Sequence, residues 1–457
     1  MKILITGATG LIGKEVGKVL AEKGHEIFVV ARDKKRAISQ LPFPCEIIEG
    51  DLGKGTLTDT RLNKIEAVIN LMGESVVGER WTDKKKNAIR TSRVDGTRHL
   101  VQSLSQAPLK AFISGSAIGY YGDCGPDIVS EEHRAGTDFL AQICVDWENE
   151  AAKAPCRSVF IRTGVVLSRR GGALDKMLLP FRLGLGGAIG KGHQWMSWIH
   201  IKDIVGLFVM ALENPKAQGA INGTAPRPAT NKDFSQALAS ALRRRLGPPI
   251  PALAIKTVFG EAGTAILSSI RASAVKAEGL GYQFYFNDLE EAFENICAPL
   301  RNGEEIFYSE QFIPENPEEV FLYFRNAHNL EELTPPTLNF NIESISTPEI
   351  QQGTIINYRL KIHGVPVKWK TEIDEWQPPY KFVDNQVKGP YSLWHHTHEF
   401  RPYCGGTLMI DKVRYRLPMG ALGWLCGLPW VRKEVDDIFN YRRQKIMTAY
   451  FATHAGK

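Results

Sequence analysis

The chain has 457 residues, of which 43% are hydrophobic and 23% are charged, and its formal net charge is +6. This length predicts two or three domains, each large enough to bury its own core. The modest net charge excludes the concentrated basicity of a nucleic-acid-binding protein. Seven scattered cysteines include no Cys-x-x-Cys pair, so neither a disulfide framework nor a zinc cluster is indicated.

The chain begins with MKILITGATG, which lacks the apolar stretch and cleavage site of a signal peptide. Together with the unpaired cysteines, this start predicts a cytoplasmic location. The longest nearly uncharged apolar run, at residues 419–431, is shorter than the roughly 20 residues of a membrane-spanning helix. We therefore expect no stable membrane insertion, and we interpret this run as a packed loop or a pocket lid.

The first part of the chain alternates short β-rich runs with helical patterns. The β-rich runs lie at residues 2–6, 26–31, 45–50, 66–72, 110–116 and 158–167. Between the first two, Val16, Val19 and Leu20 have helical spacing, and Gly24 is placed to end the helix. This order is typical of βαβ units, so we expect a doubly wound parallel sheet of Rossmann type, an α/β fold.

The pattern changes after about residue 300, where long alternating stretches with turns between them predict antiparallel strands. The expected order is a strand at 306–313, short helices at 317–326 and 328–333, strands at 354–362, 367–376 and 406–417, and a long helix at 431–451. The linker at residues 298–305 therefore predicts two domains. The first, 1–297, includes a small substrate-side subdomain, and the second is 301–457.

The motif TGATGLIG, residues 6–13, follows the first predicted strand and opens the first helix. In this context Gly7 permits a tight turn, Gly10 lets the backbone approach a pyrophosphate, and Gly13 allows close helix packing. The amide N–H groups at the helix start face the anion. A dinucleotide site is predicted here.

The end of the second strand discriminates between cofactors. An acid at this position binds the ribose 2′-hydroxyl, whereas an arginine pairs with a 2′-phosphate. Arg32 stands at or beside the deciding position, followed by Lys34, Lys35 and Arg36. This favours NADP(H); the alternative is a solvated basic turn in which Asp33 binds the ribose.

A series of further motifs gives residues 1–297 a specific resemblance. Besides TGATGLIG they are VINLMGESV, RWTDKKKNAIRTSRVDGT, SGSAIGYYG, DFLAQICVDWENEA, residues 162–203, and NGTAPRPATNKDF. The series is similar to that of the atypical extended short-chain dehydrogenase/reductase group, the epimerase-family proteins sometimes described as cell-division inhibitors. The resemblance implies an NADP(H)-binding Rossmann domain.

The resemblance also implies a set of cofactor contacts. These are Leu71, Met72 and Gly73 at the fourth strand, Arg93 near the phosphates, and Val165 and Val166 near the nicotinamide. Taken alone, Arg93 in a charged helix would more often be solvated. The predicted cofactor-binding set is completed by Leu11, Ile12, Ala31, Asp51 and Leu52.

The catalytic residues of the wider superfamily are only partly present. There a serine polarises the substrate, a tyrosine transfers the proton, and a lysine one helical turn later lowers the pKa of the tyrosine. Ser116 matches the serine, but the tyrosine and lysine positions are Phe139 with Ile143 or Leu140 with Cys144. Neither pair can move a proton in that way.

Other residues near Ser116 are the remaining candidates. Tyr120 and Tyr121 lie on the loop after the strand that carries Ser116, where an open parallel sheet binds its ligands. We predict catalytic roles for Ser116, Tyr120 and Tyr121; for either tyrosine, packing with a bonded hydroxyl is the alternative. His193 and His200 could donate a proton, but we interpret both as structural.

Residues 301–457 resemble the helix-grip domains of the START-like (SRPBCC) superfamily, in which a curved antiparallel sheet wraps a long C-terminal helix around an apolar cavity. The resemblance implies a small, apolar ligand. We expect the lining to include Trp394, Val435, Ile438, Phe439 and Ile446.

The strand LWHHTHEF places Trp394, His396, His398 and Phe400 on one face. Two histidines at this spacing can bind a metal. The sequence offers no clear third ligand, so no metal site is predicted.

These features lead to three functional hypotheses. The first is an NADP(H)-dependent oxidoreductase of atypical mechanism that acts on an apolar small molecule held with help from the second domain. The alternative is a non-catalytic NADP(H)-binding regulatory or lipid-binding protein. Nucleotide-sugar epimerisation, suggested by the family label, would need an acid–base residue that the sequence does not reveal.

Overall fold

The computed structural model describes residues 1–301, 303–362, 364–418 and 420–454. The chain divides into two compact units, one formed by Met1–Arg32 with Cys45–Arg301 and the other by Asp33–Pro44 with Asn302–Lys457. This division falls within the predicted linker at residues 298–305. The segment Asp33–Pro44 groups with the second unit, although the sequence analysis assigned it to the first domain.

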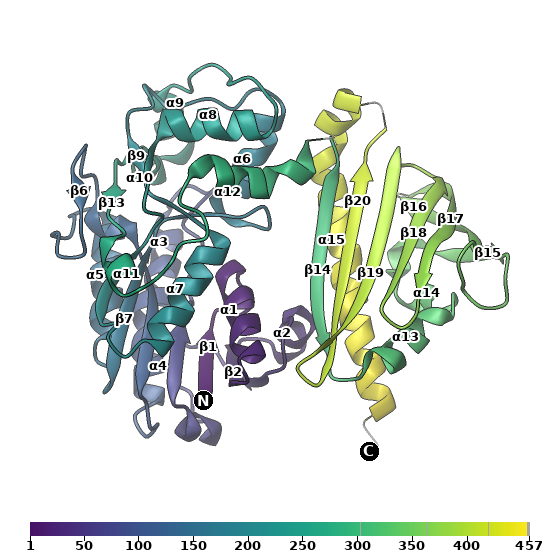
Figure 1. Ribbon diagram of the computed structural model, residues 1–457, viewed down its shortest axis with the longest axis horizontal. Coiled ribbons are helices and arrows are strands. Elements are labelled where there is room, and N and C mark those ends of the chain that lie inside the picture. The colour runs from purple at the N-terminus through teal and green to yellow at the C-terminus, as the bar shows by residue number, and fades with distance from the viewer. Residues whose placement is uncertain (302, 363, 419, 455–457) are drawn as a thin grey trace. The chain divides into compact units, whose positions relative to one another are not determined.

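The first unit contains a seven-stranded parallel sheet, as the sequence predicts (Figure 1). In spatial order its strands are β11 (Gly219–Gly223), β7 (Arg157–Thr163), β5 (Ala111–Ala117), β4 (Ala67–Asn70), β1 (Lys2–Thr6), β2 (Glu26–Ala31) and β3 (Glu46–Glu49). The chain order reverses between β1 and β4, because β1 pairs in parallel with both β2 and β4. Open α/β sheets bind their ligands at the carboxyl ends of strands at such a point.

Helices pack against this sheet and extend beyond its end. The helices of the unit are α1 (Leu11–Glu22), α3 (Asp83–Arg90), the π-helix η2 (Thr91–Asp95), α4 (Gly96–Ser103), α5 (Phe139–Ala151), α6 (Gly172–Arg182), α7 (Ile201–Glu213), α8 (Asn231–Ala241), α9 (Ala252–Phe259), α10 (Glu261–Leu267), α11 (Val275–Gly279) and α12 (Leu289–Cys297). Short 3-10 turns are η1 (Thr60–Lys64), η3 (Ile118–Tyr121) and η4 (Ala298–Leu300). Three short strand pairs complete the unit: β8 (Val165–Leu167) with β10 (Trp198–His200), β9 (Trp195–Met196) with β12 (Ala229–Thr230), and β6 (Ile128–Val129) with β13 (Arg271–Ala272).

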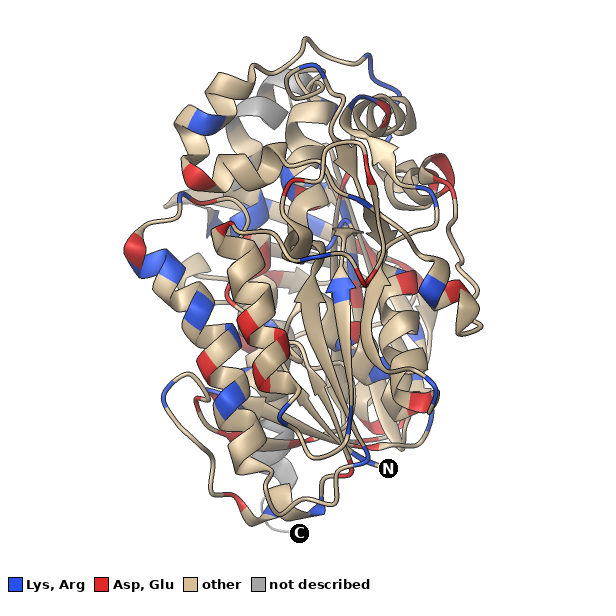
Figure 2. Ribbon diagram, turned by 90° about the vertical axis from the view of Figure 1, so that its left-hand side faces the viewer, with Lys and Arg blue, Asp and Glu red and all other residues tan. Residues whose placement is uncertain are grey.

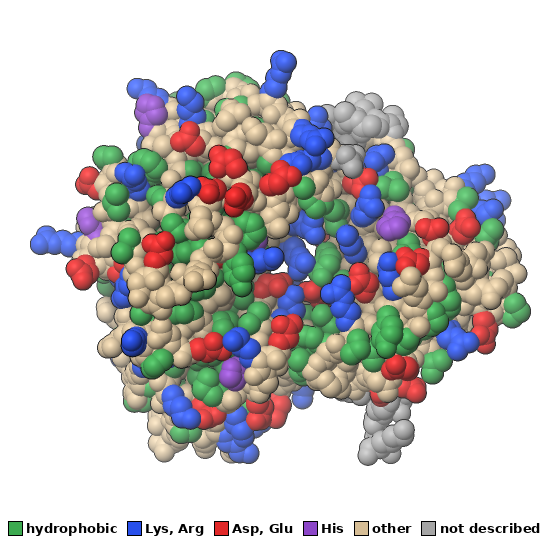
Figure 3. Space-filling model, in the orientation of Figure 1, with side chains coloured by type: hydrophobic (Ala, Val, Ile, Leu, Met, Phe, Trp, Pro, Cys, Tyr) green, Lys and Arg blue, Asp and Glu red, His purple; other side chains and the backbone are tan. Residues whose placement is uncertain are grey.

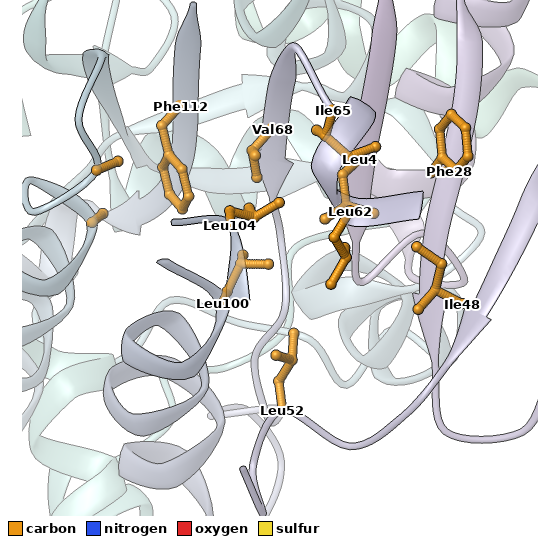
Figure 4. Close-up of a cluster of buried hydrophobic side chains, with 12 residues drawn as sticks. Leu4, Phe28, Ile48, Leu52, Leu62, Ile65, Val68, Leu100, Leu104 and Phe112 are labelled. Atoms are coloured by element: carbon orange, nitrogen blue, oxygen red, sulfur yellow. The ribbon is translucent and has the colours of Figure 1, made fainter. Parts of the chain in front are cut away.

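The core of the first unit follows from the apolar periodicity of its elements. Val16 and Leu20 of α1 are fully buried, and Gly24, with a φ of +79°, ends the helix in a conformation that glycine adopts without strain. Leu4, Val68 and Phe112 of three neighbouring strands belong to one hydrophobic cluster with Leu100 of α4 and with Leu104, which follows that helix (Figure 4). The cluster fixes the strands whose carboxyl ends carry the candidate site.

The second unit contains a seven-stranded antiparallel sheet. In spatial order its strands are β14 (Glu305–Ile313), β20 (Gly406–Arg416), β19 (Leu393–Tyr403), β18 (Lys381–Lys388), β17 (Val365–Gln377), β16 (Ile355–Ile362) and β15 (Asn341–Ile345). Its helices are α2 (Lys34–Gln40), α13 (Pro317–Arg325), α14 (Asn329–Glu332) and α15 (Gly420–His454), with a 3-10 turn η5 (Pro336–Leu338). Figure 1 shows α15 running along this sheet.

The C-terminal helix begins earlier than predicted. Residues 419–431 were expected to form a loop or a lid and the helix to start at residue 431, but α15 begins at Gly420; Met419 lies outside the described residues. The run contains alanine and leucine, which favour helix. It lacks the charged residues that made the helical periodicity recognisable further on, so the prediction placed the start too late.

Charged residues of both signs are interspersed in the views of Figures 2 and 3. Figure 2 shows lysines and arginines interspersed with acidic residues along the helices of that face. On the face in Figure 3, apolar side chains lie among charged ones. Within the described part of the chain, every helix is too short or too polar to cross a membrane.

Candidate cofactor and catalytic site

The turn between β1 and α1 is shaped for close approach of a ligand. Gly7 has a φ of +66°, and a Cβ built on it would lie 2.5 Å from the carbonyl oxygen of Leu71. A Cβ on Gly13 would lie 2.4 Å from the carbonyl oxygen of Gly7. Any larger residue would push the turn away from the ends of β1 and β4, so glycine is required at both positions.

The start of α1 fits the pyrophosphate of a dinucleotide. Gly10, which has no side chain, is the N-cap, and Leu11, Ile12 and Gly13 form the first turn. The N–H groups of a first turn have no partner within the helix, and the helix dipole makes this end attractive to anions. The predicted glycines therefore form a cradle with the correct sign of charge.

Arg32 and Asp33 have different surroundings at the end of β2. Arg32 is exposed. The Asp33 carboxylate caps α2, because its Oδ1 accepts a hydrogen bond from the N–H of Arg36 at 2.9 Å. The alternative hypothesis assigned Asp33 to the ribose, but this bond engages its carboxylate within the chain. Arg32 is therefore the stronger candidate, for a contact with a 2′-phosphate.

The predicted residues after β4 lie together. The N–H of Leu71 donates to the Oγ1 of Thr6, and a Cβ on Gly73 would lie 2.9 Å from the Cζ of Arg93. Arg93 donates to the carbonyl oxygen of Glu74 at 2.8 Å, and burial lowers the pKa of its guanidinium. Arg93 is therefore a half-buried cation bonded to the backbone, and not the fully solvated residue that its charged helix suggests.

The other predicted cofactor residues are distributed around this edge. Ala31 ends β2, Val165 and Val166 form part of β8, and Met72 follows Leu71. Asp51 accepts the N–H of Gly53 at 3.1 Å. The side chain of Leu52 belongs to the hydrophobic core, where it is 3% exposed, so only its backbone is available to a ligand.

Ser116 lies in a buried ionic network. It is opposite Arg162 in the register of β5 with β7, and its hydroxyl donates to the Oε1 of Glu148 at 2.6 Å. Arg162 binds both carboxylate oxygens of Glu148, each at 2.9 Å. Burial disfavours the charge of Arg162, but the bonds to Glu148 outweigh it and raise the pKa of the guanidinium. Ser116 is thus joined to a carboxyl group that Arg162 holds through two hydrogen bonds.

The two predicted catalytic tyrosines are attached to the same network. The hydroxyl of Tyr121, whose side chain is 3% exposed, donates to the Oδ1 of Asn222 at 2.6 Å and accepts from Arg162 at 3.1 Å. Burial raises its pKa to about 12. The guanidinium of Arg162 stacks on the ring of Tyr120, 3.4 Å from its centre. Tyr121 is therefore packed with its hydroxyl bonded, which is the alternative to a catalytic role. Tyr120 is half-buried beside it.

The α5 positions at which the superfamily has its tyrosine and lysine carry no side chain that could transfer a proton in their place. Leu140 packs beside the position of Gly119, and Ile143 is buried. Cys144 is also buried, which raises the pKa of its thiol to about 12 and keeps it protonated. The α5 side chain that is hydrogen-bonded to Ser116 is instead Glu148, one helical turn beyond Cys144.

The two histidines considered as proton donors are structural in this arrangement. His193 is exposed. His200 caps α7, its Nδ1 accepting from the N–H of Lys202 at 3.2 Å, and its ring contacts that of Phe286. Burial lowers the pKa of His200 to about 4, so it stays neutral.

Sequence reasoning missed Glu148, Arg162 and Asn222. One signal was available: Arg162 interrupts the apolar β7 strand, and a charge in a buried strand requires a partner. The partner, Glu148, lies 14 residues earlier on the preceding helix, which offers several carboxylates, so the sequence alone does not identify it.

The second unit contains a partly open cavity of about 170 Å³. Trp394, Ile438 and Phe439 line it, as predicted, whereas Val435 and Ile446 pack in hydrophobic clusters. One part of the wall is polar and includes Asp384, His396 and His398. The sequence analysis found no third ligand beside the two histidines; Asp384 is brought to them by the pairing of β18 with β19.

The fold and the glycine-lined helix start define a Rossmann-type dinucleotide-binding protein of the short-chain dehydrogenase/reductase class. The NAD dependent epimerase/dehydratase family matches residues 3–222, and a domain of unknown function, DUF1731, matches residues 250–296. Neither match extends into residues 301–457.

Relatives that match about two thirds of this chain are known. The chloroplastic epimerase family protein SDR39U1 homolog of Arabidopsis thaliana is 36% identical over 306 residues, 65% of this chain and 86% of that protein. Epimerase family protein SDR39U1 of Mus musculus is 36% identical over 307 residues, 65% of this chain and 100% of that protein. The solved structure of human SDR39U1 with NADPH is 35% identical, with a TM-score of 0.59, and covers 66% of this chain and 100% of that one. The chain belongs to this epimerase family.

Proposed function

We propose that the protein is an NADP(H)-dependent oxidoreductase that interconverts a hydroxyl and a carbonyl group on a small, apolar molecule. The observation that carries this proposal is the 2.6 Å hydrogen bond from Ser116 to the buried carboxylate of Glu148. This pair takes the place of the missing tyrosine and lysine.

NADP(H) is the proposed cofactor for two reasons. The human relative was solved with NADPH. In this chain Arg32 is exposed at the end of β2, while Asp33 caps α2. The glycine cradle and the start of α1 would hold its pyrophosphate. When bound, the nicotinamide supplies or accepts a hydride.

The chain itself would handle the proton. With its own hydrogen donated to Glu148, the Ser116 oxygen presents lone pairs to a substrate hydroxyl. It accepts the proton of that hydroxyl and passes its own proton to Glu148, and the reverse movement protonates the oxygen when a carbonyl is reduced. Arg162 holds the carboxylate in the orientation that receives this bond. Tyr120, stacked on Arg162, would shape the substrate side.

Hydride transfer is the direct test. NADPH labelled with deuterium at the transferring position is incubated with a panel of apolar aldehydes and ketones, and the alcohols are analysed by mass spectrometry. We expect deuterium on the former carbonyl carbon for at least one compound, and its loss in Ser116→Ala. If the protein binds NADPH but labels no member of the panel, the proposal is contradicted and the binding-protein alternative is favoured.

Cofactor selectivity gives a second prediction. Removal of a charge-assisted hydrogen bond costs roughly 1.5–3 kcal/mol, so Arg32→Ala is expected to weaken NADPH binding about ten- to a hundredfold. Binding of NADH should change little. Fluorescence titration of both cofactors measures this, with Lys35→Ala as the neighbouring control. Equal affinities of the wild-type protein for NADPH and NADH would contradict the assignment.

In the same proposal, the second unit is a helix-grip domain of START-like (SRPBCC) type that helps to hold the apolar substrate. Its antiparallel sheet, its long helix α15 and its largely apolar cavity support this assignment. A cytoplasmic location fits the free thiols of the described cysteines. Displacement of a fluorescent fatty-acid-like probe from the full chain tests the ligand class.

A further inference from the structure

Four ionisable side chains converge on the inner face of three neighbouring strands in the second unit. Asp384 of β18 is opposite His396 of β19, and His398 of β19 is opposite Asp411 of β20. His396, His398 and Asp411 are at most 5% exposed. Because buried charges require partners, the distances within this cluster decide what it can bind.

Asp411 lies against one edge of both imidazole rings. Its Oδ1 is 3.0 Å from the Nε2 of His396 and 3.0 Å from the Nδ1 of His398. A carboxylate that accepts from both nitrogens places a proton on each of them. The lone pairs of both rings then lie on the opposite nitrogens, the Nδ1 of His396 and the Nε2 of His398.

These two nitrogens face a third electron-pair donor. The Oδ2 of Asp384 is 3.3 Å from the Nδ1 of His396 and 2.9 Å from the Nε2 of His398. The three ligand atoms lie within 4.8 Å of one another. Metal–nitrogen and metal–oxygen bonds of about 2.0–2.2 Å place neighbouring ligand atoms roughly 3 Å apart. Three lone pairs in such proximity repel one another unless a cation lies between them.

We propose that Asp384, His396 and His398 bind a divalent first-row transition metal ion. The ligand set of two imidazoles and one carboxylate suits zinc or iron(II). All three residues line the cavity, so the remaining coordination positions face the space in which a substrate or ligand would lie. Asp411 orients both imidazoles from behind, as carboxylates commonly do at metal sites.

Arg442 of α15 defines the competing arrangement. Its Nη2 is 3.1 Å from the Nδ1 of His398 and 3.7 Å from the Oδ1 of Asp411. If the guanidinium donates to His398, the proton of that ring moves to Nε2 and is donated to Asp384, and the cluster is a metal-free hydrogen-bond network. With a metal bound, Arg442 instead balances the charge of Asp411. Metal binding therefore distinguishes the two arrangements.

The experiment uses the full chain, stripped of metal by a chelator and titrated with Zn²⁺ in competition with a chromogenic chelator. We expect one tightly bound ion per chain. Asp411→Asn removes a residue that orients the ligands, so it should weaken Zn²⁺ binding about 10- to 100-fold. Asp384→Asn and His396→Gln each remove a proposed ligand, so each should weaken Zn²⁺ binding by more than about 100-fold. Co²⁺ should give ligand-field absorption in the wild-type protein, which reports the site without any variant.

His395→Gln is the matched control. It lies on the same strand, but on the opposite face, where its Nδ1 contacts the Oδ1 of Asn385. Its Zn²⁺ affinity should equal that of the wild type. The proposal is overturned if wild-type protein takes up no stoichiometric Zn²⁺ and gives no Co²⁺ absorption. Equal Zn²⁺ affinity in wild type and Asp384→Asn also overturns it, because the ion then binds elsewhere.

Discussion

Replacing Glu148 with glutamine is expected to lower the rate of hydride transfer by about 10²- to 10⁴-fold, the usual contribution of a positioned acid–base group. Glutamine has nearly the same shape and still accepts the hydrogen bond from Ser116, but it cannot take up a proton. NADPH affinity should stay close to that of the wild type, because Glu148 is hydrogen-bonded to Ser116 and Arg162 and glutamine keeps the shape of the side chain. Single-turnover transfer from NADPH measures the chemical step.

A double variant separates catalysis from folding. Glu148→Gln alone leaves Arg162 without its carboxylate, whereas Glu148→Gln with Arg162→Met removes both charges. If Glu148 carries the proton, the double variant regains stability but stays slow. Recovery of the rate in the double variant would assign the network a structural role only.

Replacing Arg162 with methionine should lower the free energy of unfolding of the first unit by about 3–5 kcal/mol, the usual cost of leaving one partner of a buried ion pair unpaired. Arg162 is 3% exposed and Glu148 is 8% exposed, so water cannot replace the lost hydrogen bonds. The substitution also removes the bonds to Tyr121 and to the carbonyl oxygen of Glu131. Hydrogen exchange of β5 and β7 peptides measures the local opening.

Arg90→Met is the control for the loss of an arginine–carboxylate pair. Arg90 of α3 contacts Asp146 of α5, the helix that also carries Glu148, at 2.7 Å, but the side chain of Arg90 is 47% exposed. Such pairs contribute roughly 0–1 kcal/mol. If the two variants destabilise the unit equally, burial is not what makes the Arg162 pair important.

The sequence by itself determined the elements whose signals are local. The strand, glycine turn and helix around Gly7, Gly10 and Gly13 depend on neighbouring residues, so the parallel fold and the cofactor cradle were predictable. The basic position of Arg32 could also be read directly, because it follows the strand by one residue. The predicted start of α15 was wrong, because the first turns of this helix are apolar and lack the charged periodicity that marks a surface helix.

Only the tertiary structure decided which polar side chains meet. Ser116, Glu148 and Arg162 come from β5, α5 and β7, and no spacing in the chain relates a strand residue to a helix residue packed across it. The same holds for Asp384, which strand register places beside His396. Tyr121 was predicted to face substrate because its loop is at the binding edge, but the direction of its side chain depends on Asn222, about a hundred residues away. Local patterns specify backbone conformation, whereas the packing of distant segments specifies side-chain partners and therefore chemistry.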